Sequence, residues 1–327
     1  MSKKIGITIL KAAVTVSIIA FIIHRLGWRH IVSAIAKADM VWLFAALGLF
    51  ILSGVLGVQQ WRILLANKGI QLTYRRAFVL YYVGMFFNNF MFGMVAGDAV
   101  KVALIRSNSG NIKGGFAATF LDRFAGLWAM MGFAIFGSII LLNRGMINES
   151  RLATAFIALI VAFVGFTIIC AFIVSQRLQR LSFRLLDMLP IPAKERIRGI
   201  IKEVILEVHD RHLLVPVALL STLIQLMRIV VHILCAAALG LLTMANFQYF
   251  FIFVPFMAVL MLIPLPFGIK ESIGGSLFIL AGFSPDSPEQ PLVMEFLASL
   301  IGIAASLIGG VFFVTRKLKT TGDLPVK

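Results

Sequence analysis

The chain has 327 residues, of which 60% are hydrophobic and only 13% are charged. A soluble fold of this length could not bury so much apolar surface, so a soluble globular protein is excluded and an all-α polytopic membrane protein is predicted. The 30 Lys and Arg residues outnumber the 14 Asp and Glu residues, giving a net charge of +16. We attribute this excess to cytoplasmic loops that face anionic lipid, and we expect no nucleic-acid partner.

Six clear apolar runs have at least the roughly 20 residues that a helix needs to cross a bilayer. They lie at 5–24, 41–60, 115–142, 152–174, 213–242 and 292–315. Two further apolar regions, at 77–105 and 249–282, are interrupted at their centres by polar residues, Gly or Pro. We expect each interrupted region to form a re-entrant hairpin of two broken helices, which gives about eight membrane segments.

The distribution of basic residues favours this threading. If both hairpins return to the side from which they enter and the amino terminus is cytoplasmic, 21 of the 30 Lys and Arg residues are cytoplasmic and five are outside. A complete crossing by the first interrupted region would move the eight basic residues of 177–211 to the outside, against the positive-inside tendency. We therefore predict a multi-pass protein of the bacterial cytoplasmic (inner) membrane with both termini in the cytoplasm.

This threading divides a single integral membrane domain into two halves of inverted topology. The first half is 1–142, the segment 143–212 contributes a span and a basic amphipathic connector, 213–315 completes the second half, and 316–327 is a cytoplasmic tail. Inverted repeats whose broken helices meet near the midplane of the membrane are a recurring plan of secondary transporters. The topology therefore favours a transport function.

The first interrupted region carries polar groups that a lipid-facing helix would not favour. Asn88 and Asn89 can each donate and accept hydrogen bonds, and Asp98 and Lys101 are three residues apart, hence neighbours on a helix. Polar side chains at membrane depth are tolerated mainly where protein or a wet cavity surrounds them. We therefore predict that this region forms part of a binding site.

Charged residues also fall inside predicted spans. Arg228 lies at the centre of 213–242, where insertion costs roughly 2.5 to 3.5 kcal/mol, so it should have a partner. That partner is either a carboxylate that holds the helices together or a bound anion. Asp122 and Arg123 lie about two turns into their span, where they either snorkel to the interface as a pair or face a site.

The second interrupted region offers another place for an anion. Pro264 and Pro266 end one half-helix, and Lys270 and Glu271 open the next. The amino terminus of a half-helix presents free N–H groups and the positive end of the helix dipole, which suits phosphate or carboxylate. The alternative is a structural kink with surface charges.

Three short segments carry a family resemblance. Phe-Asn-Asn-Phe and Gly-Asp-Ala-Val-Lys within 87–101, Thr-Phe-Leu-Asp-Arg at 119–123 and Phe-Gly-Ile-Lys-Glu at 267–271 resemble the membrane region of lysylphosphatidylglycerol synthase and its flippase-like relatives. The family pattern has Arg where this chain has Lys101 and Lys270, so each position keeps its charge and loses a bidentate guanidinium. A different headgroup preference is therefore expected.

The resemblance implies lipid movement, because in that family the membrane region looks like a translocator while a separate soluble domain attaches the amino acid. No segment of these 327 residues resembles that soluble domain. We therefore expect a lipid translocase, not an enzyme, that moves an anionic phosphate-bearing lipid or lipid-linked intermediate, such as an anionic phospholipid or a polyprenyl phosphate, between leaflets. The alternative is a membrane-embedded enzyme, or enzyme subunit, that modifies phospholipids or lipid-linked glycans.

The expected site residues fall into two groups. Those expected to bind the lipid headgroup are Asn88, Asn89, Lys101, Arg123, Arg228 and Lys270. Those expected to act as counter-ions or proton-coupling groups are Asp98, Asp122 and Glu271. The sequence contains no recognised catalytic, metal-binding or cofactor motif, so no cofactor is expected, and the oligomeric state is left open.

Overall fold

The computed structural model describes a helical core of this chain. The described residues are 36, 38–90, 94–109, 111–143, 161, 164–165, 167–168, 211–260, 269–284 and 290–315. Regular structure within them is helical throughout. The predicted span at 5–24, nearly all of the segment 143–212 and the tail at 316–327 lie outside the described residues.

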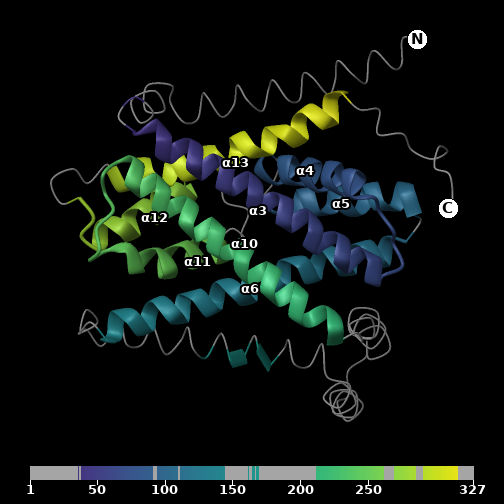
Figure 1. The fold of residues 1–327 in the computed structure, drawn as a ribbon, viewed down its shortest axis with the longest axis horizontal. Helices are drawn as coiled ribbons and strands as arrows, with labels where there is room; N and C mark the ends of the chain where they lie inside the picture. The colour runs from purple at the N-terminus through teal and green to yellow at the C-terminus, as the bar shows by residue number, and fades with distance from the viewer. Residues whose placement is uncertain are drawn as a thin grey trace.

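The described helices form two sets with the same order of long, short, short and long (Figure 1). The first set is α3 (Met40–Asn67), α4 (Tyr74–Phe90), α5 (Met94–Ser109) and α6 (Ile112–Asn143). The second set is α10 (Arg211–Ala238), α11 (Phe250–Leu260), which the short 3-10 helix η1 (Phe247–Tyr249) precedes, α12 (Ile269–Leu280) and α13 (Gln290–Thr315). Each interrupted apolar region of the sequence is therefore a pair of separate short helices.

Capping residues fix the ends of the long helices. Asp39 precedes α3, and its side chain accepts a hydrogen bond of 2.8 Å from the backbone N–H of Val41. Gly69 follows α3 and Gly240 follows α10, each with a positive φ that glycine adopts without strain. Because Gly240 stops α10, this helix ends at Ala238, before the boundary at 242 that hydrophobicity alone predicted.

Length separates the long helices from the short ones. Among the described helices, α3, α6, α10 and α13 are long and apolar enough to cross a membrane. The 17 residues of α4 and the 12 of α12 extend about 25 Å and about 18 Å, less than the roughly 30 Å of a hydrocarbon core. Each short pair can therefore reach only part of the way across, and its predicted re-entrant placement in the bilayer stays a prediction.

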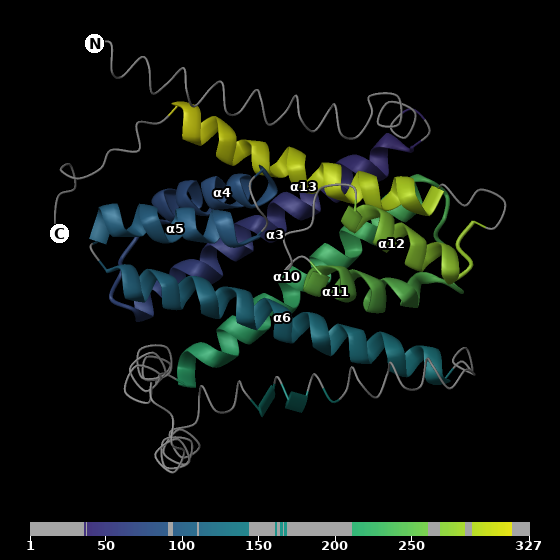
Figure 2. The same ribbon diagram turned by 180° about the vertical axis from the view of Figure 1, so that it is seen from behind.

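The two sets are inverted relative to each other. The backbone N–H of Asp39, at the start of α3, donates to the carbonyl of Ala238, at the end of α10, at 2.8 Å. Further along, the Ser221 hydroxyl in α10 donates to the Gln60 amide oxygen in α3 at 2.9 Å. The two helices are therefore antiparallel, and the short pairs that follow them lie at opposite ends of the bundle (Figures 1 and 2).

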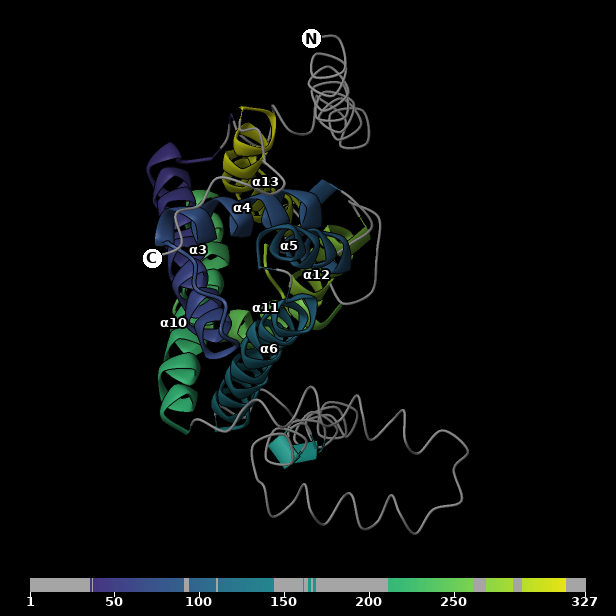
Figure 3. The ribbon, with the colours of Figure 1, turned by 90° about the vertical axis from the view of Figure 1, so that its right-hand side faces the viewer.

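The short helices lie to one side of the wall that α3 and α10 form. Figure 3 looks along the bundle and shows α5 and α12 across from this wall. Glycine permits the closest approach within the first pair, because a Cβ at Gly97 of α5 would overlap the backbone carbonyl of Gly84 in α4. The Asn88 side chain accepts a hydrogen bond of 2.9 Å from the N–H of Gly97 and fixes the same junction. This packing holds the start of α5 beside α6.

Candidate functional site

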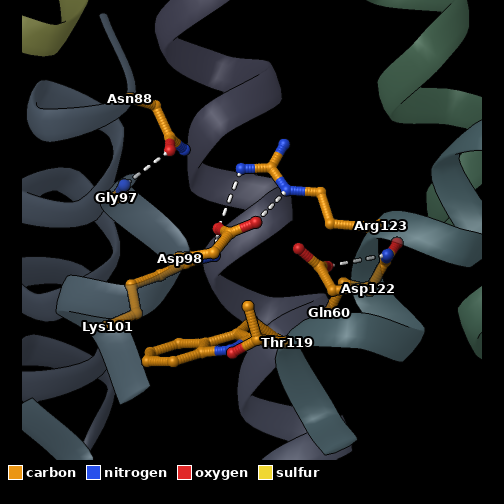
Figure 4. A network of polar contacts seen from close by, with 9 residues as sticks. Gln60, Asn88, Gly97, Asp98, Lys101, Thr119, Asp122 and Arg123 are labelled. Carbon is orange, nitrogen blue, oxygen red and sulfur yellow. Dashed lines mark hydrogen bonds and ion pairs between the residues drawn. The ribbon is translucent and has the colours of Figure 1, made fainter. Parts of the chain in front are cut away.

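Asp98, near the start of α5, is held by two cations (Figure 4). Arg123 of α6 donates from Nε to Oδ2 at 2.8 Å and from Nη2 to Oδ1 at 3.0 Å, a two-pronged contact. Lys101 places Nζ 2.9 Å from Oδ1. Asp98 and Lys101 therefore form the contact that their three-residue spacing predicted. Arg123 reaches the same carboxylate from α6, the next long helix.

Lys101 is held in an aromatic setting that the sequence did not reveal. Its side chain is only 2% exposed, and Nζ lies 5.4 Å from the ring centre of Trp61 and 5.0 Å from that of Tyr81. Both rings therefore lie within the range of cation–π attraction. The indole N–H of Trp61 donates to the Thr119 hydroxyl at 3.0 Å, which holds the ring in place. Aromatic residues in apolar runs carry no distinctive sequence signal, which is why these partners were missed.

Asp122 belongs to a buried hydrogen-bond chain that joins the two helix sets. Gln60 Nε2 donates to Asp122 Oδ1 at 2.9 Å, and the Ser221 hydroxyl donates to Gln60 Oε1 at 2.9 Å. All three side chains are buried. Gln60 and Ser221 were also missed by sequence reasoning, although a polar residue in the interior of an apolar span is a usable signal.

Neighbouring residues of α6 thus bond in different directions. Arg123 bonds to α5 and Asp122 bonds to α3 (Figure 4). The two side chains therefore face the interior of the bundle, and the snorkelling pair considered from the sequence is wrong.

A cavity of about 60 Å³ lies where the two sets meet. Its polar and charged lining is Gln60, Asp122, Arg123, Ser221, Gln225 and Arg228, and the apolar remainder comes from α4, α6, α10 and α11. A single water needs about 10 to 15 Å³, so the cavity could hold roughly four waters or one phosphate-sized group. Asp122, Arg123 and Arg228, which the sequence assigned to one site, thus line one cavity, and their roles toward a headgroup stay predictions.

Arg228 keeps an unsatisfied donor at this cavity. Its Nε atom and the Oε1 atom of Gln225 are buried and have no hydrogen-bond partner among the described residues. None of the ion pairs in that part of the chain involves Arg228. Buried polar groups normally have partners, so a vacant donor beside a cavity indicates a place for an acceptor.

The charge of the cluster favours an anion. Its bases are Lys101, Arg123 and Arg228, whereas its acids are Asp98 and Asp122, so one positive charge is left over when all five are ionised. Asp98 and Asp122 offset two of the three positive charges, and Arg228 is the base of the three that forms no ion pair among the described residues.

A family model described as lysylphosphatidylglycerol synthase TM region matches residues 8–287. The chain belongs to this family. Four spanning-length helices and this membership make it a multi-pass membrane protein. A search of curated proteins and a search of solved structures each gave no match.

In this member of the lysylphosphatidylglycerol synthase TM family, the two adjacent amides of α4 connect helices. Asn88 bonds to Gly97 in α5, as described above, and Asn89 Nδ2 donates to the carbonyl of Gly302 in α13 at 3.3 Å. Neither residue lines the cavity. The role in headgroup binding that the sequence suggested for them stays a prediction, and the geometry assigns them a positioning contact.

A second charged cluster lies between α10, α12 and α13. Lys270 Nζ is 3.3 Å from Glu271 Oε1, and the Ser299 hydroxyl donates to the same oxygen at 2.6 Å. Glu295 Oε1 is 3.0 Å from His232 Nδ1. Lys270 and Glu271 do not line the cavity. Glu295 was not selected from the sequence, although an acid inside a predicted span was an available signal.

Within the part of the chain that the structure describes, no group of three or more His, Cys, Asp and Glu side chains could hold a metal ion.

Proposed function

We propose that this protein moves an anionic, phosphate-bearing lipid between the two leaflets of a bacterial cytoplasmic membrane. The observation that carries the proposal is the buried, unpartnered Nε of Arg228 at a phosphate-sized cavity with a surplus of positive charge. Membership in the lysylphosphatidylglycerol synthase TM family supports a lipid as the ligand. Both termini are placed in the cytoplasm on the distribution of basic residues.

The headgroup binds at the cavity while the acyl chains stay in the surrounding lipid. The phosphate accepts a hydrogen bond from Arg228 Nε and is attracted by Arg123, which also lines the cavity. Hydrogen bonds to a charged group typically contribute about 1.5 to 3 kcal/mol. Asp98 and Lys101 act one step further away, because they hold the Arg123 guanidinium in place.

The two short helix pairs provide the route to the cavity from either side. Tyr81 of α4 and Ala258 of α11 both line it, so each short pair contributes to its wall. Because the pairs lie at opposite ends of the bundle, displacing one pair opens the cavity toward one leaflet and displacing the other opens it toward the second. This is alternating access around a fixed site, as in transporters built from inverted repeats.

Purified protein in phosphatidylcholine liposomes tests the proposal. Trace labelled phosphatidylglycerol, a labelled polyprenyl phosphate and labelled phosphatidylcholine serve as probes, and the exchange of each probe between leaflets is followed. We expect faster exchange than in empty liposomes for at least one anionic probe. Empty-liposome rates for both anionic probes would overturn the proposal, and conversion of a probe to a new lipid, detected by mass spectrometry, would favour the membrane-embedded enzyme.

A further inference from the structure

The second charged cluster contains an acid that is almost completely enclosed. Glu295 is 1% exposed, and a Cβ at Gly274 would lie 3.0 Å from its Oε2 atom, so the backbone of α12 covers the carboxylate. A buried carboxylate is tolerated when it is paired and hydrogen-bonded. Its ion-pair partner among the described residues is His232, whose Nδ1 lies 3.0 Å from Oε1. The buried carboxylate of Glu295 is therefore stabilised by an imidazole, a group that can bind or release a proton.

Among the described residues, the other titratable groups beside this pair form no ion pair with Glu295. On α12, Lys270 pairs with Glu271, which also accepts from Ser299, so these two opposite charges cancel. On α10, the buried thiol of Cys235 lies close enough to interact electrostatically with Glu295. With a neutral imidazole and a carboxylate the cluster has a net charge of −1, and with an imidazolium it is neutral. One proton therefore decides whether the enclosed region is charged.

His232 is the less buried member of this pair and lies one helical turn from Arg228, which lines the cavity. Its side chain is 21% exposed, and because Nδ1 faces Glu295, Nε2 is the ring nitrogen that remains for proton exchange. His232 follows Arg228 by four residues on α10, so the two side chains share a face with Cβ atoms about 5 to 6 Å apart. A negative charge held by Arg228 would therefore lie close to the imidazole.

We propose that His232 and Glu295 form a proton-binding site and that its proton crosses the membrane together with the anionic lipid. The inference rests on the proposed function, because it assigns an energy source to that transport. A phosphate at Arg228 favours the imidazolium, and the imidazolium in turn favours the phosphate by the same factor. The proton adds to His232 Nε2 from water on the side where the site is open, and it leaves to water on the other side, so only an N–H bond forms and breaks.

Cotransport makes a prediction about charge. A phosphatidylglycerol headgroup with one negative charge and one proton cross as a neutral pair, so the membrane potential does not drive them and a pH gradient does. At equilibrium a gradient of one pH unit should shift the leaflet ratio of the lipid about tenfold toward the alkaline side, into which the proton moves. If the lipid crossed without the proton, the membrane potential would shift its leaflet ratio about tenfold per 59 mV, and the pH gradient would not change that ratio.

The exchange assay with labelled phosphatidylglycerol and the polyprenyl phosphate measures both responses. Liposomes that hold the full chain receive a gradient of one pH unit with the potential set to zero by K⁺ and valinomycin, and in a second arm a potential at equal pH. We expect accumulation of the exchanging probe in the alkaline-side leaflet and, for phosphatidylglycerol, no response to the potential. Exchange without any response to the pH gradient would overturn cotransport and leave the proposed function standing, whereas no exchange of either probe would overturn both.

Glu295→Gln and His232→Gln should abolish the response to the gradient. Ser276→Ala is the matched control, because Ser276 lies exposed on α12 with its hydroxyl bonded to the carbonyl of Ser272 in its own helix. A gradient response that survives in both site variants would remove His232 and Glu295 from the site.

A second measurement needs no variant and covers the case in which the substitutions prevent folding. When a short-chain phosphatidylglycerol is added to the wild-type protein in weakly buffered detergent, the protein should take up protons from solution as the lipid binds. A pH indicator records this uptake. Saturable binding without proton uptake would overturn the proposal.

Discussion

The two helix sets share one order of helices and differ in the partners of one acid. In the first set, Asp98 of the second short helix, α5, is held by Lys101 of the same helix and by Arg123 of the next long helix, α6. In the second set, the corresponding acid, Glu271, is held by Lys270 of its own helix and by the hydroxyl of Ser299 in the next long helix. The difference is a guanidinium in one set and a neutral hydroxyl in the other.

This difference assigns different chemistry to the two sets. Arg123 is one of the three bases of the cluster around the cavity, whereas α13 carries a hydroxyl at Ser299 and, four residues earlier, an additional buried acid, Glu295. The same order of helices therefore pairs the acid of the second short helix with two cations in the first set and with one cation and a hydroxyl in the second. Variants that are matched between the sets can test this contrast.

Neutralising the acid of α5 or the acid of α12 should give the largest difference in stability between the two sets. Asp98→Asn leaves two adjacent cations without their carboxylate, and breaking such a pair lowers the free energy of unfolding by about 3 kcal/mol. Glu271→Gln keeps an oxygen for the Ser299 hydroxyl and removes the negative charge beside Lys270, which is partly exposed, so we expect a loss of about 1 kcal/mol. Unfolding of both variants in one detergent checks this, and equal losses would contradict the contrast.

Adding one methyl group to a glycine of α5 or of α12 should give the next largest difference in stability between the sets. In Gly97→Ala the new Cβ meets a backbone carbonyl, which cannot move without displacing α4, so we expect a loss of about 2 kcal/mol in the free energy of unfolding. In Gly274→Ala it meets the Glu295 side chain at 3.0 Å, which can shift slightly, so the loss should stay below about 1 kcal/mol. Thermal unfolding compares the two, and a more damaging Gly274→Ala would show that α12 is packed as rigidly as α5.

The junction between the sets offers a smaller test on adjacent residues of α10. Ser221→Ala removes the donor to buried Gln60 and should lower the free energy of unfolding by about 1 kcal/mol. Thr222→Ala removes an exposed hydroxyl that bonds within its own helix and should change it by less than about 0.5 kcal/mol. Chemical denaturation of both variants measures the difference, and a Ser221→Ala variant as stable as Thr222→Ala would show that the chain from Ser221 to Asp122 does not join the sets.

The sequence predicted the helical plan well, because its signals are local. Runs of apolar residues located α3, α6, α10 and α13, and polar residues, Gly and Pro located the breaks inside the two short pairs. The end of α10 was missed because hydrophobicity continues past Gly240, where backbone conformation stops the helix. The spacing of Asp98 and Lys101 was likewise sufficient to predict their contact.

Contacts between distant segments could not be predicted in the same way. Arg123 was recognised as a charge in a span, but that its partner is Asp98 depends on how α5 packs against α6. Trp61 and Glu295 were not selected, because their roles arise only where α4, α5, α10 or α12 approaches them. A charge inside a span thus indicates that a partner exists, and only the packing shows which residue it is.

The most direct test of the central claim compares Arg228→Ala with Thr222→Ala in the liposome assay, using the labelled phosphatidylglycerol and polyprenyl phosphate. Both residues lie on α10, and only Arg228 lines the cavity. If Arg228 binds the phosphate, its removal should slow exchange of the anionic probe by roughly ten- to a hundredfold, as expected for the loss of a charged hydrogen bond, while Thr222→Ala exchanges at the wild-type rate. A folded Arg228→Ala protein that exchanges anionic lipid as fast as the control would contradict the account.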